Sequence, residues 1–176
     1  MKKTILFLVA ISLFIVGCVN EVETTHVQQI AKGEVIGLEV GNTVPDFSIT
    51  TIDGDNIKLS DKPTVVYFFA SWCPHCRNDF NAVRQVYNDY KDDVNFIAID
   101  LDTKETAQHI KNYKAQFPGI EAITFAPGNR NILTQYQVRY TTTKYALGKG
   151  QKLVYKGSGE ISPQQWRTLF EAIKDA

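Results

Sequence analysis

The chain has no excess of charge of either sign. It contains 19 lysines and arginines and 19 aspartates and glutamates, so its formal net charge is zero. A nucleic-acid-binding domain usually carries a basic patch or stripe, and this balance gives no sign of one. We therefore expect no nucleic acid among its partners. The remaining composition is that of an ordinary globular protein, and it predicts one domain and a monomer.

Cysteine is scarce, with three residues in the whole chain. Cys18 ends an apolar N-terminal run, so Cys73 and Cys76 remain as an isolated pair and no cysteine is left for a structural disulfide. In an oxidising compartment such a pair can cycle between dithiol and disulfide. Zinc requires about four ligands, and the other histidines, His26 and His109, form no second ligand pair. A metal or Fe-S carrier using the two cysteines stays the alternative, although we expect no metal site.

The N-terminus has the pattern of a signal peptide. Lys2 and Lys3 precede an apolar run from Ile5 to Val16, which matches a charged n-region followed by an h-region. Gly17 stands directly before Cys18, and this arrangement resembles the lipobox of bacterial lipoproteins. The resemblance implies that cleavage makes Cys18 the new N-terminus and that Cys18 carries lipid.

Three segments follow from this interpretation. Residues 1–17 are the predicted signal peptide, residues 18–41 the lipidated N-terminus with a polar tether, and residues 42–176 the folded domain. An uncleaved membrane anchor is one alternative, but the stretch from Thr4 to Val19 is shorter than the roughly 20 residues that span the hydrocarbon core. A fully released protein is the other alternative.

Hydrophobic patterns predict an α/β fold for the domain. An N-terminal β-hairpin is followed by a βαβαβ segment with a short helix, and then by two strands and a helix, which gives a central mixed sheet flanked by helices. The predicted strands cover residues 47–51, 57–59, 65–70, 94–99, 122–125, 144–147 and 152–155, and the predicted helices begin near residues 74, 102, 129 and 162.

Two of the predicted helices rest on specific signals. Pro74 suits the first position of a helix, and apolar residues at helical spacing extend the prediction through Tyr90. Asp102 and Glu105 have the spacing of a capping box, which predicts that the second helix opens at Asp102.

The pair Cys73 and Cys76 lies where a buried strand gives way to a helix. A cysteine at a helix N-terminus has unpaired backbone N–H groups and the positive end of the helix dipole beside its sulfur, which favours the reactive thiolate. Cys76 lies one turn further on, on the same side of the helix. The two sulfurs can therefore close a disulfide or resolve a mixed disulfide with a substrate.

Three segments resemble the TlpA/ResA-like redoxin branch of the thioredoxin superfamily: Val44 to Phe47, Phe68 to Phe80, and Tyr136 to Thr143. The resemblance covers nearly all of the predicted domain and implies a thioredoxin-like fold. It also implies that Cys73 is the attacking thiolate and Cys76 the buried resolving thiol of a thiol-disulfide oxidoreductase.

The resemblance also implies partners and a location. Members of this branch are commonly exported or membrane-tethered, so we expect exported thiol or disulfide proteins as substrates, a membrane electron donor or acceptor, and no bound cofactor. The expected location is the outer side of the bacterial cell membrane. A peroxidase is not expected, because peroxiredoxins need a threonine three residues before the reactive cysteine, where this chain has Ala70.

The acidic groups near the pair differ from those of thioredoxin. The acidic helix residue of this branch aligns with Asp79, three residues after Cys76 on the same helix face. Asp79 is therefore a candidate proton acceptor for Cys76, with a solvated surface carboxylate as the alternative. The strand acid of thioredoxin itself would fall at Tyr67, so it is absent.

Pro74 and His75 between the cysteines resemble the disulfide oxidase DsbA. A partly charged His75 near the helix N-terminus would favour the Cys73 thiolate and make the disulfide more oxidising. We expect a reduction potential between those of DsbA and thioredoxin; a merely exposed polar His75 is the alternative.

The loop expected to face the cysteines lacks a proline. Thioredoxin folds place a cis-proline there, but this chain has Thr141, Thr142 and Thr143. A cis bond before Thr142 would cost about 3 to 4 kcal/mol, so the loop either stores strain or is trans and differently shaped. Thr141 and Thr142 are candidate substrate contacts. Trp72 is a third, as a flat apolar wall beside the disulfide, unless it is simply packed.

Overall fold

The computed structural model describes residues 35–176. The predicted signal peptide, Cys18 and most of the predicted tether lie outside the described residues. None of the helices in the described part combines the length and the apolar character needed to cross a membrane.

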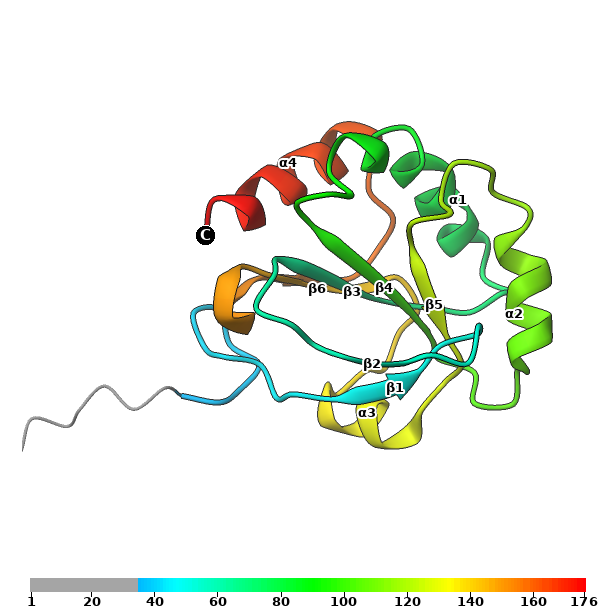
Figure 1. The fold of residues 1–176 in the computed structure, drawn as a ribbon, viewed down its shortest axis with the longest axis horizontal. Helices are drawn as coiled ribbons and strands as arrows, with labels where there is room; N and C mark the ends of the chain where they lie inside the picture. Colours follow the sequence, from blue (N-terminus) through cyan, green and yellow to red (C-terminus); the bar gives the residue numbers. More distant parts are fainter. Residues whose placement is uncertain (1–34) are drawn as a thin grey trace, which may run out of the picture. The chain divides into compact units, whose positions relative to one another are not determined.

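The domain has a thioredoxin-like α/β fold built on a mixed sheet of five strands, as predicted (Figure 1). Its strands, in spatial order, are β5 (Thr124–Ala126), β4 (Asn95–Asp100), β3 (Thr64–Phe69), β6 (Thr143–Leu147) and β7 (Leu153–Gly157). The central strand β3 runs parallel to β4 and antiparallel to β6. The predicted N-terminal hairpin is present as β1 (Ser48–Thr50) and β2 (Asn56–Lys58).

Helices cover both faces of the sheet (Figure 1). They are α1 (Pro74–Val83), α2 (Ala107–Lys114), α3 (Arg130–Gln135) and α4 (Pro163–Lys174). All six residues of β3 are buried, because the strand is covered on both sides. Its side chains alternate between two cores: Val65, Tyr67 and Phe69 join the core that includes α1 and α4, while Val66 and Phe68 join the core that includes α3.

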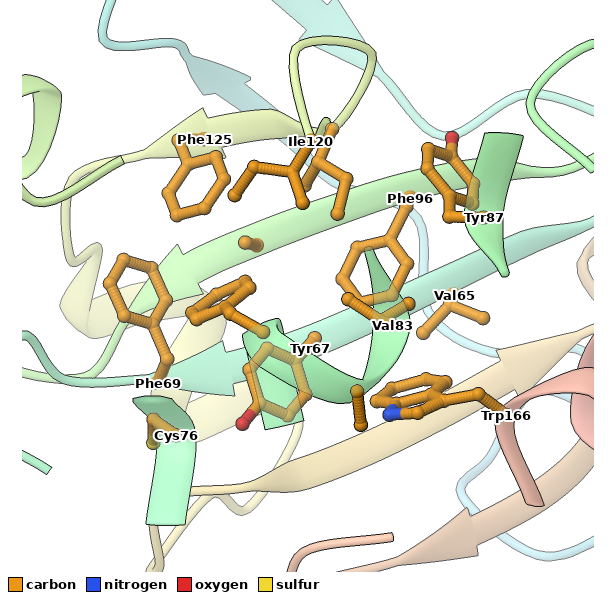
Figure 2. Close-up of a cluster of buried hydrophobic side chains, with 14 of the residues drawn as sticks. Val65, Tyr67, Phe69, Cys76, Val83, Tyr87, Phe96, Ile120, Phe125 and Trp166 are labelled. Carbon is orange, nitrogen blue, oxygen red and sulfur yellow. The ribbon is translucent and has the colours of Figure 1, made fainter. Parts of the chain in front are cut away.

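Aromatic rings join β3 to the helices that carry the site. The Tyr67 ring packs edge-on against Phe80 of α1, with centroids 5.4 Å apart, and against Trp166 of α4, at 6.1 Å. Figure 2 shows Tyr67 and Trp166 in this core, with the Tyr67 hydroxyl directed toward the part of α1 that carries Cys76. This packing fixes the start of α1 relative to the central strand.

The first helix is shorter than predicted. It ends at Val83, and Tyr87 lies in a separate 3-10 turn, Tyr87–Asp89. Between them the backbone changes to tighter i→i−3 hydrogen bonds, and Val86 leaves the helical region with φ −130°. Tyr87 and Tyr90 are nevertheless buried, because their rings pack against Phe170. The apolar spacing thus predicted the burial of these residues correctly but not the continuous helix.

The second helix begins later than predicted, because Asp102 and Glu105 have other partners. Thr106 is the N-cap of α2, and its side chain accepts the N–H of His109 at 3.2 Å. Asp102 accepts a backbone N–H two residues on, in the preceding turn, and Glu105 accepts a hydrogen bond from Ser71. The predicted capping box at Ser162, with Pro163 at the first helical position of α4, is present.

Backbone hydrogen bonds tie residues 35–43 to the sheet. The N–H of Gly41 donates to the carbonyl of Leu153 on β7 at 2.8 Å, and Gly37 donates to Thr43 at 2.9 Å. Thr43 also forms a β-bridge with Lys152. The predicted boundary between residues 41 and 42 therefore falls inside a hydrogen-bonded turn.

Candidate active site

The two cysteines lie at the N-terminus of α1, directly after the buried strand β3. Cys73 is the N-cap residue, with extended backbone angles, and Pro74 takes the first helical position. The Cys73 N–H donates to the carbonyl of Ala70 at 3.1 Å, which closes the turn between strand and helix. The Cys73 sulfur in turn accepts the backbone N–H of Cys76 at 3.2 Å. The helix end thus offers a hydrogen-bond donor to this sulfur.

Both cysteines are unbonded thiols, and both are buried. Burial raises the pKa of Cys76 to about 12, and its hydrogen bond with Cys73 acts in the same direction. The Cys73 thiol contacts the Thr141 hydroxyl at 3.3 Å. The loop formed by Thr141, Thr142 and Thr143, called the threonine loop below, therefore faces the cysteine pair. Two exposed aromatic side chains stand beside these residues in the chain: Trp72 is 63% exposed and Tyr140 is 70% exposed.

Asp79 is buried and is not a solvated surface carboxylate. Its Oδ1 accepts the N–H of Ile161 at 2.8 Å, and its Oδ2 accepts hydrogen bonds from Tyr67 at 2.9 Å and from Lys144 at 2.8 Å. Burial raises the pKa of Asp79, while the charge of Lys144 opposes that rise. The carboxylate is therefore held by donors from three separate parts of the chain.

Lys144 is a fully buried lysine that was not among the residues predicted from the sequence. Besides Asp79, its Nζ donates to the carbonyls of Thr142 at 2.9 Å and Gly159 at 2.5 Å. The ammonium group also lies 5.1 Å from the centre of the Tyr67 ring. Burial lowers the pKa of Lys144, and the charge of Asp79 counteracts this. Lysine is rarely buried, so its presence in a predicted strand beside the central strand was the sequence signal that could have identified this residue.

Tyr67 lies in the central strand, where the resemblance places the strand acid of thioredoxin. Its hydroxyl donates to Asp79 Oδ2 at 2.9 Å and is directed toward the part of α1 that carries Cys76 (Figure 2). Burial, followed by the charge of Asp79, raises the pKa of Tyr67 well above its ordinary value. The tyrosine hydroxyl thus binds the carboxylate and faces Cys76.

His75 is exposed and pairs with a residue that precedes α4. Its Nδ1 lies 3.2 Å from Glu160 Oε2, which also accepts a hydrogen bond from Asn78 at 2.8 Å. The hydrogen bonds from Asn78 and His75 lower the pKa of Glu160. Sequence reasoning did not predict Glu160, because no local pattern indicates that the start of α4 meets the start of α1.

The threonine loop is trans and differently shaped from a cis-proline loop. The peptide bond before Thr142 is trans, and Thr142 has φ +63°, in the left-handed region that β-branched residues rarely adopt. Its hydroxyl oxygen accepts the N–H of Gly159 at 2.8 Å, and its carbonyl accepts the hydrogen bond from Lys144. These bonds hold a conformation that the side chain itself disfavours.

Comparisons with known proteins agree with this geometry. A model of the AhpC/TSA family matches residues 40–164. The chain belongs to the AhpC/TSA family. It is 29% identical over 178 residues to the thiol-disulfide oxidoreductase ResA of Bacillus cereus, covering 98% of each chain. It is 31% identical to the thioredoxin-like protein YneN of Bacillus subtilis, covering 68% of this chain and 71% of that one. Within the family it is a ResA/TlpA-like thiol-disulfide oxidoreductase.

Solved structures share the fold at lower identity. StoA from Bacillus subtilis matches with a TM-score of 0.59 at 16% identity, covering 71% of this chain and 96% of that chain. A thiol:disulfide interchange protein of the thioredoxin family from Chlorobium tepidum matches with a TM-score of 0.68 at 19% identity, covering 77% and 98%. These likenesses establish the thioredoxin-like fold of this AhpC/TSA family member.

Within residues 35–176, no three histidine, cysteine, aspartate or glutamate side chains are grouped so that they could hold a metal ion. The hydroxyl of Thr141 is the side-chain group of the facing loop that contacts Cys73. Neutral hydroxyls are not the soft ligands that accompany thiolates in zinc or Fe-S sites.

A second acidic cluster lies beside the loop that carries the cysteines. Ser71 donates to Glu105 Oε1 and lies 2.9 Å from His109, while Trp72 donates to Asp102 at 3.3 Å. Asp100 is buried at the end of β4, and its Oδ1 accepts the N–H of Asp102 at 2.8 Å. This cluster anchors both residues that precede Cys73.

The carboxyl groups of Asp100 and Glu105 interact in the interior of the domain. Asp100 Oδ2 and Glu105 Oε2 are both buried without a donor from the described residues. A proton held between the two groups would give each oxygen a partner. Burial and the hydrogen bond with Glu105 raise the pKa of Asp100 to about 8.

We expect this carboxyl pair to make the protein less stable as the pH rises. The pKa of Asp100 is about 8 in the folded chain but about 3.9 in an unfolded one, so the folded state binds the extra proton between these values. The free energy of unfolding should therefore fall as the pH rises from about 4 to about 8. Asp100→Asn, which stays neutral and can donate to Glu105, should remove at least about 1 kcal/mol of that fall.

Urea unfolding at about pH 5, 7 and 9 measures this effect. Asp61→Asn, at an exposed carboxylate, is the control and should keep the pH dependence of the unchanged protein. An Asp100→Asn variant with the same pH dependence as the unchanged protein would show that no proton is shared.

Proposed function

We propose that this thiol-disulfide oxidoreductase works on the outer side of a bacterial cell membrane, held there by lipid on Cys18, and exchanges disulfides with exported proteins. The observation that carries the exchange chemistry is the placement of both cysteines at the start of α1, where the sulfur of the N-cap residue Cys73 accepts the backbone N–H of Cys76. The location is supported by the charged and apolar N-terminal pattern that ends at Cys18. The proposed domain limits are residues 1–17, 18–41 and 42–176.

In the proposed reaction, the Cys73 thiolate attacks a substrate disulfide. A bond forms between Cys73 Sγ and one substrate sulfur, and the other substrate sulfur leaves as a thiolate. Cys76, after losing its proton, attacks Cys73 Sγ, closes the Cys73–Cys76 disulfide and releases the second substrate thiolate. The same steps in reverse oxidise a substrate dithiol. No bound cofactor takes part, and a membrane electron donor or acceptor resets the pair.

Neighbouring residues have distinct proposed roles. Asp79 accepts the Cys76 proton, which is consistent with its burial beside the pair. Pro74 and His75 tune the reduction potential, since both lie at the helix end that faces Cys73.

Substrate contacts are proposed on both sides of Cys73. Trp72 is exposed and offers a flat apolar surface, while Thr141 touches the Cys73 sulfur and Thr142 shapes the same loop. A substrate approaching Cys73 would pass between these residues.

The order of attack is tested by trapping. Cys76→Ser leaves Cys73 without its resolving thiol, so mixed disulfides with protein substrates should accumulate and be visible on non-reducing gels. Cys73→Ser is the matched variant and should trap nothing. If Cys76→Ser accumulates no mixed disulfides while Cys73→Ser stays active, the assignment of the two cysteines is reversed. Stoichiometric metal in anaerobically purified protein would instead favour a metal or Fe-S carrier.

The reduction potential is expected to lie between about −270 mV for thioredoxin and about −120 mV for DsbA. His75→Ser should make it more negative, because removing the imidazole beside the helix N-terminus destabilises the Cys73 thiolate and therefore the reduced form. Equilibration with glutathione measures both values, and Lys174→Ser, which removes a cation at the far end of α4, is the control. A potential at or below that of thioredoxin contradicts the proposed tuning.

Lipidation of the full-length chain is tested with Cys18→Ala. In a bacterial host the unchanged protein should incorporate a labelled fatty acid and sediment with membranes, whereas Cys18→Ala should incorporate none. Cys73→Ala should be labelled like the unchanged protein. The alternative, an uncleaved anchor, predicts a different result. Neither the unchanged protein nor Cys18→Ala would then incorporate the fatty acid, and both would sediment with membranes.

A further inference from the structure

The Tyr67 hydroxyl connects the buried carboxylate to the surroundings of the resolving cysteine. It donates to Asp79 Oδ2 at 2.9 Å, and Figure 2 shows it directed toward the part of α1 that carries Cys76. The other donors to the carboxylate are the Ile161 N–H, on Oδ1, and the Lys144 ammonium, on Oδ2. Tyr67 is therefore placed to pass a proton between Cys76 and Asp79.

We propose that Tyr67 is a catalytic residue that carries the proton between Cys76 and Asp79, and that Lys144 keeps the charge of the site balanced during the transfer. This proposal rests on the proposed function, in which Cys76 is the resolving thiol. It adds the group through which the proton moves and the counter-charge that makes the move possible.

The transfer consists of two linked proton movements. The Tyr67 O–H bond breaks as its proton passes to Asp79 Oδ2, and the Tyr67 oxygen takes the proton of the Cys76 thiol. The products are a neutral Asp79 carboxyl, an intact Tyr67 phenol and a Cys76 thiolate. The Tyr67 hydroxyl can then donate to that thiolate, which attacks Cys73. When the disulfide is reduced, the same protons return by the same route.

Charge conservation makes this route favourable inside the protein. Before the transfer, buried Lys144 faces the Asp79 carboxylate at 2.8 Å; afterwards it faces a carboxyl group and the nearby Cys76 thiolate. The net charge of the site does not change, so no uncompensated charge is buried. Direct loss of the Cys76 proton to water would instead add a negative charge to a site whose burial already raises the pKa of Cys76 to about 12.

Other titratable groups also face Cys76. Tyr113 on α2 interacts electrostatically with it, and the guanidinium of Arg77 lies 5.7 Å from the centre of the Tyr113 ring. The Cys73 sulfur accepts the backbone N–H of Cys76 at 3.2 Å. From the segment before α4, Glu160 acts on Lys144. Tyr67 differs from these groups because it hydrogen-bonds the carboxylate and its hydroxyl is directed toward Cys76.

Tyr67→Phe tests the proposal, because it removes the hydroxyl and keeps the ring that packs in the core. With one equivalent of dithiobis(nitrobenzoate), attack by Cys73 releases the first nitrothiobenzoate and resolution by Cys76 releases the second, and rapid mixing separates the two. We expect Tyr67→Phe to leave the first step unchanged and to slow the second by at least about 10-fold. The second step should also become more dependent on pH, because hydroxide from solvent must then remove the proton.

Tyr145→Phe is the matched control. Tyr145 is a buried tyrosine of the same sheet, and its hydroxyl donates to the carbonyl of Tyr136 at 2.5 Å, on the other side of β6. This variant loses a buried hydrogen bond of similar kind, so its stability should fall comparably while both steps keep their rates.

The carboxylate should belong to the same route. Asp79→Asn should slow the second step about as much as Tyr67→Phe, and the double variant should be little slower than either single one. A second step unaffected by Tyr67→Phe, or two steps slowed equally, would overturn the proposal. Failure of the proposed function is distinguishable, because then the unchanged protein would release no first equivalent from Cys73.

Discussion

The buried ion pair between Asp79 and Lys144 is the interaction on which the site depends. It joins α1 to β6, and each partner also binds the backbone that leads into α4, through Ile161 and Gly159. Removing one partner would leave an uncompensated buried charge, at a cost of about 3 to 5 kcal/mol. Such a pair is an inefficient way to gain stability, since apolar residues of the same volume often serve as well. Its position beside Cys76 therefore favours a role in the chemistry.

The ion pair also explains why a tyrosine can occupy the strand position of the thioredoxin acid. Tyr67 is packed among aromatic rings of the core, where an isolated carboxylate would be costly. With the acid on the helix, at Asp79, Lys144 compensates its charge, while the phenol faces Cys76. In the proposed mechanism the acid-base function is thus divided between two elements, and each group lies where its burial is tolerable.

The sequence predicts the parts of the site that are local in the chain. The burial of β3, the helix start at Pro74 and the position of Cys73 at that start all follow from neighbouring residues, and the structure has each of them. Lys144 and Glu160 could not be found in this way, because they reach the pair from strands and loops far along the chain. The predicted start of α2 was wrong for a related reason. The Glu105 carboxylate accepts a hydrogen bond from Ser71, a residue distant in the chain, and does not cap its own helix.

The threonine loop shows how closely docking and chemistry are connected here. A cis-proline fixes the facing loop by covalent geometry, whereas Thr142 is held in its left-handed conformation by hydrogen bonds from Gly159 and Lys144. The ammonium group that holds this carbonyl is the one that pairs with Asp79. A change in the charge of the carboxylate therefore acts on the loop that touches Cys73 through Thr141. In this protein one buried lysine, Lys144, binds both the loop that a substrate would contact and the carboxylate that would accept the proton.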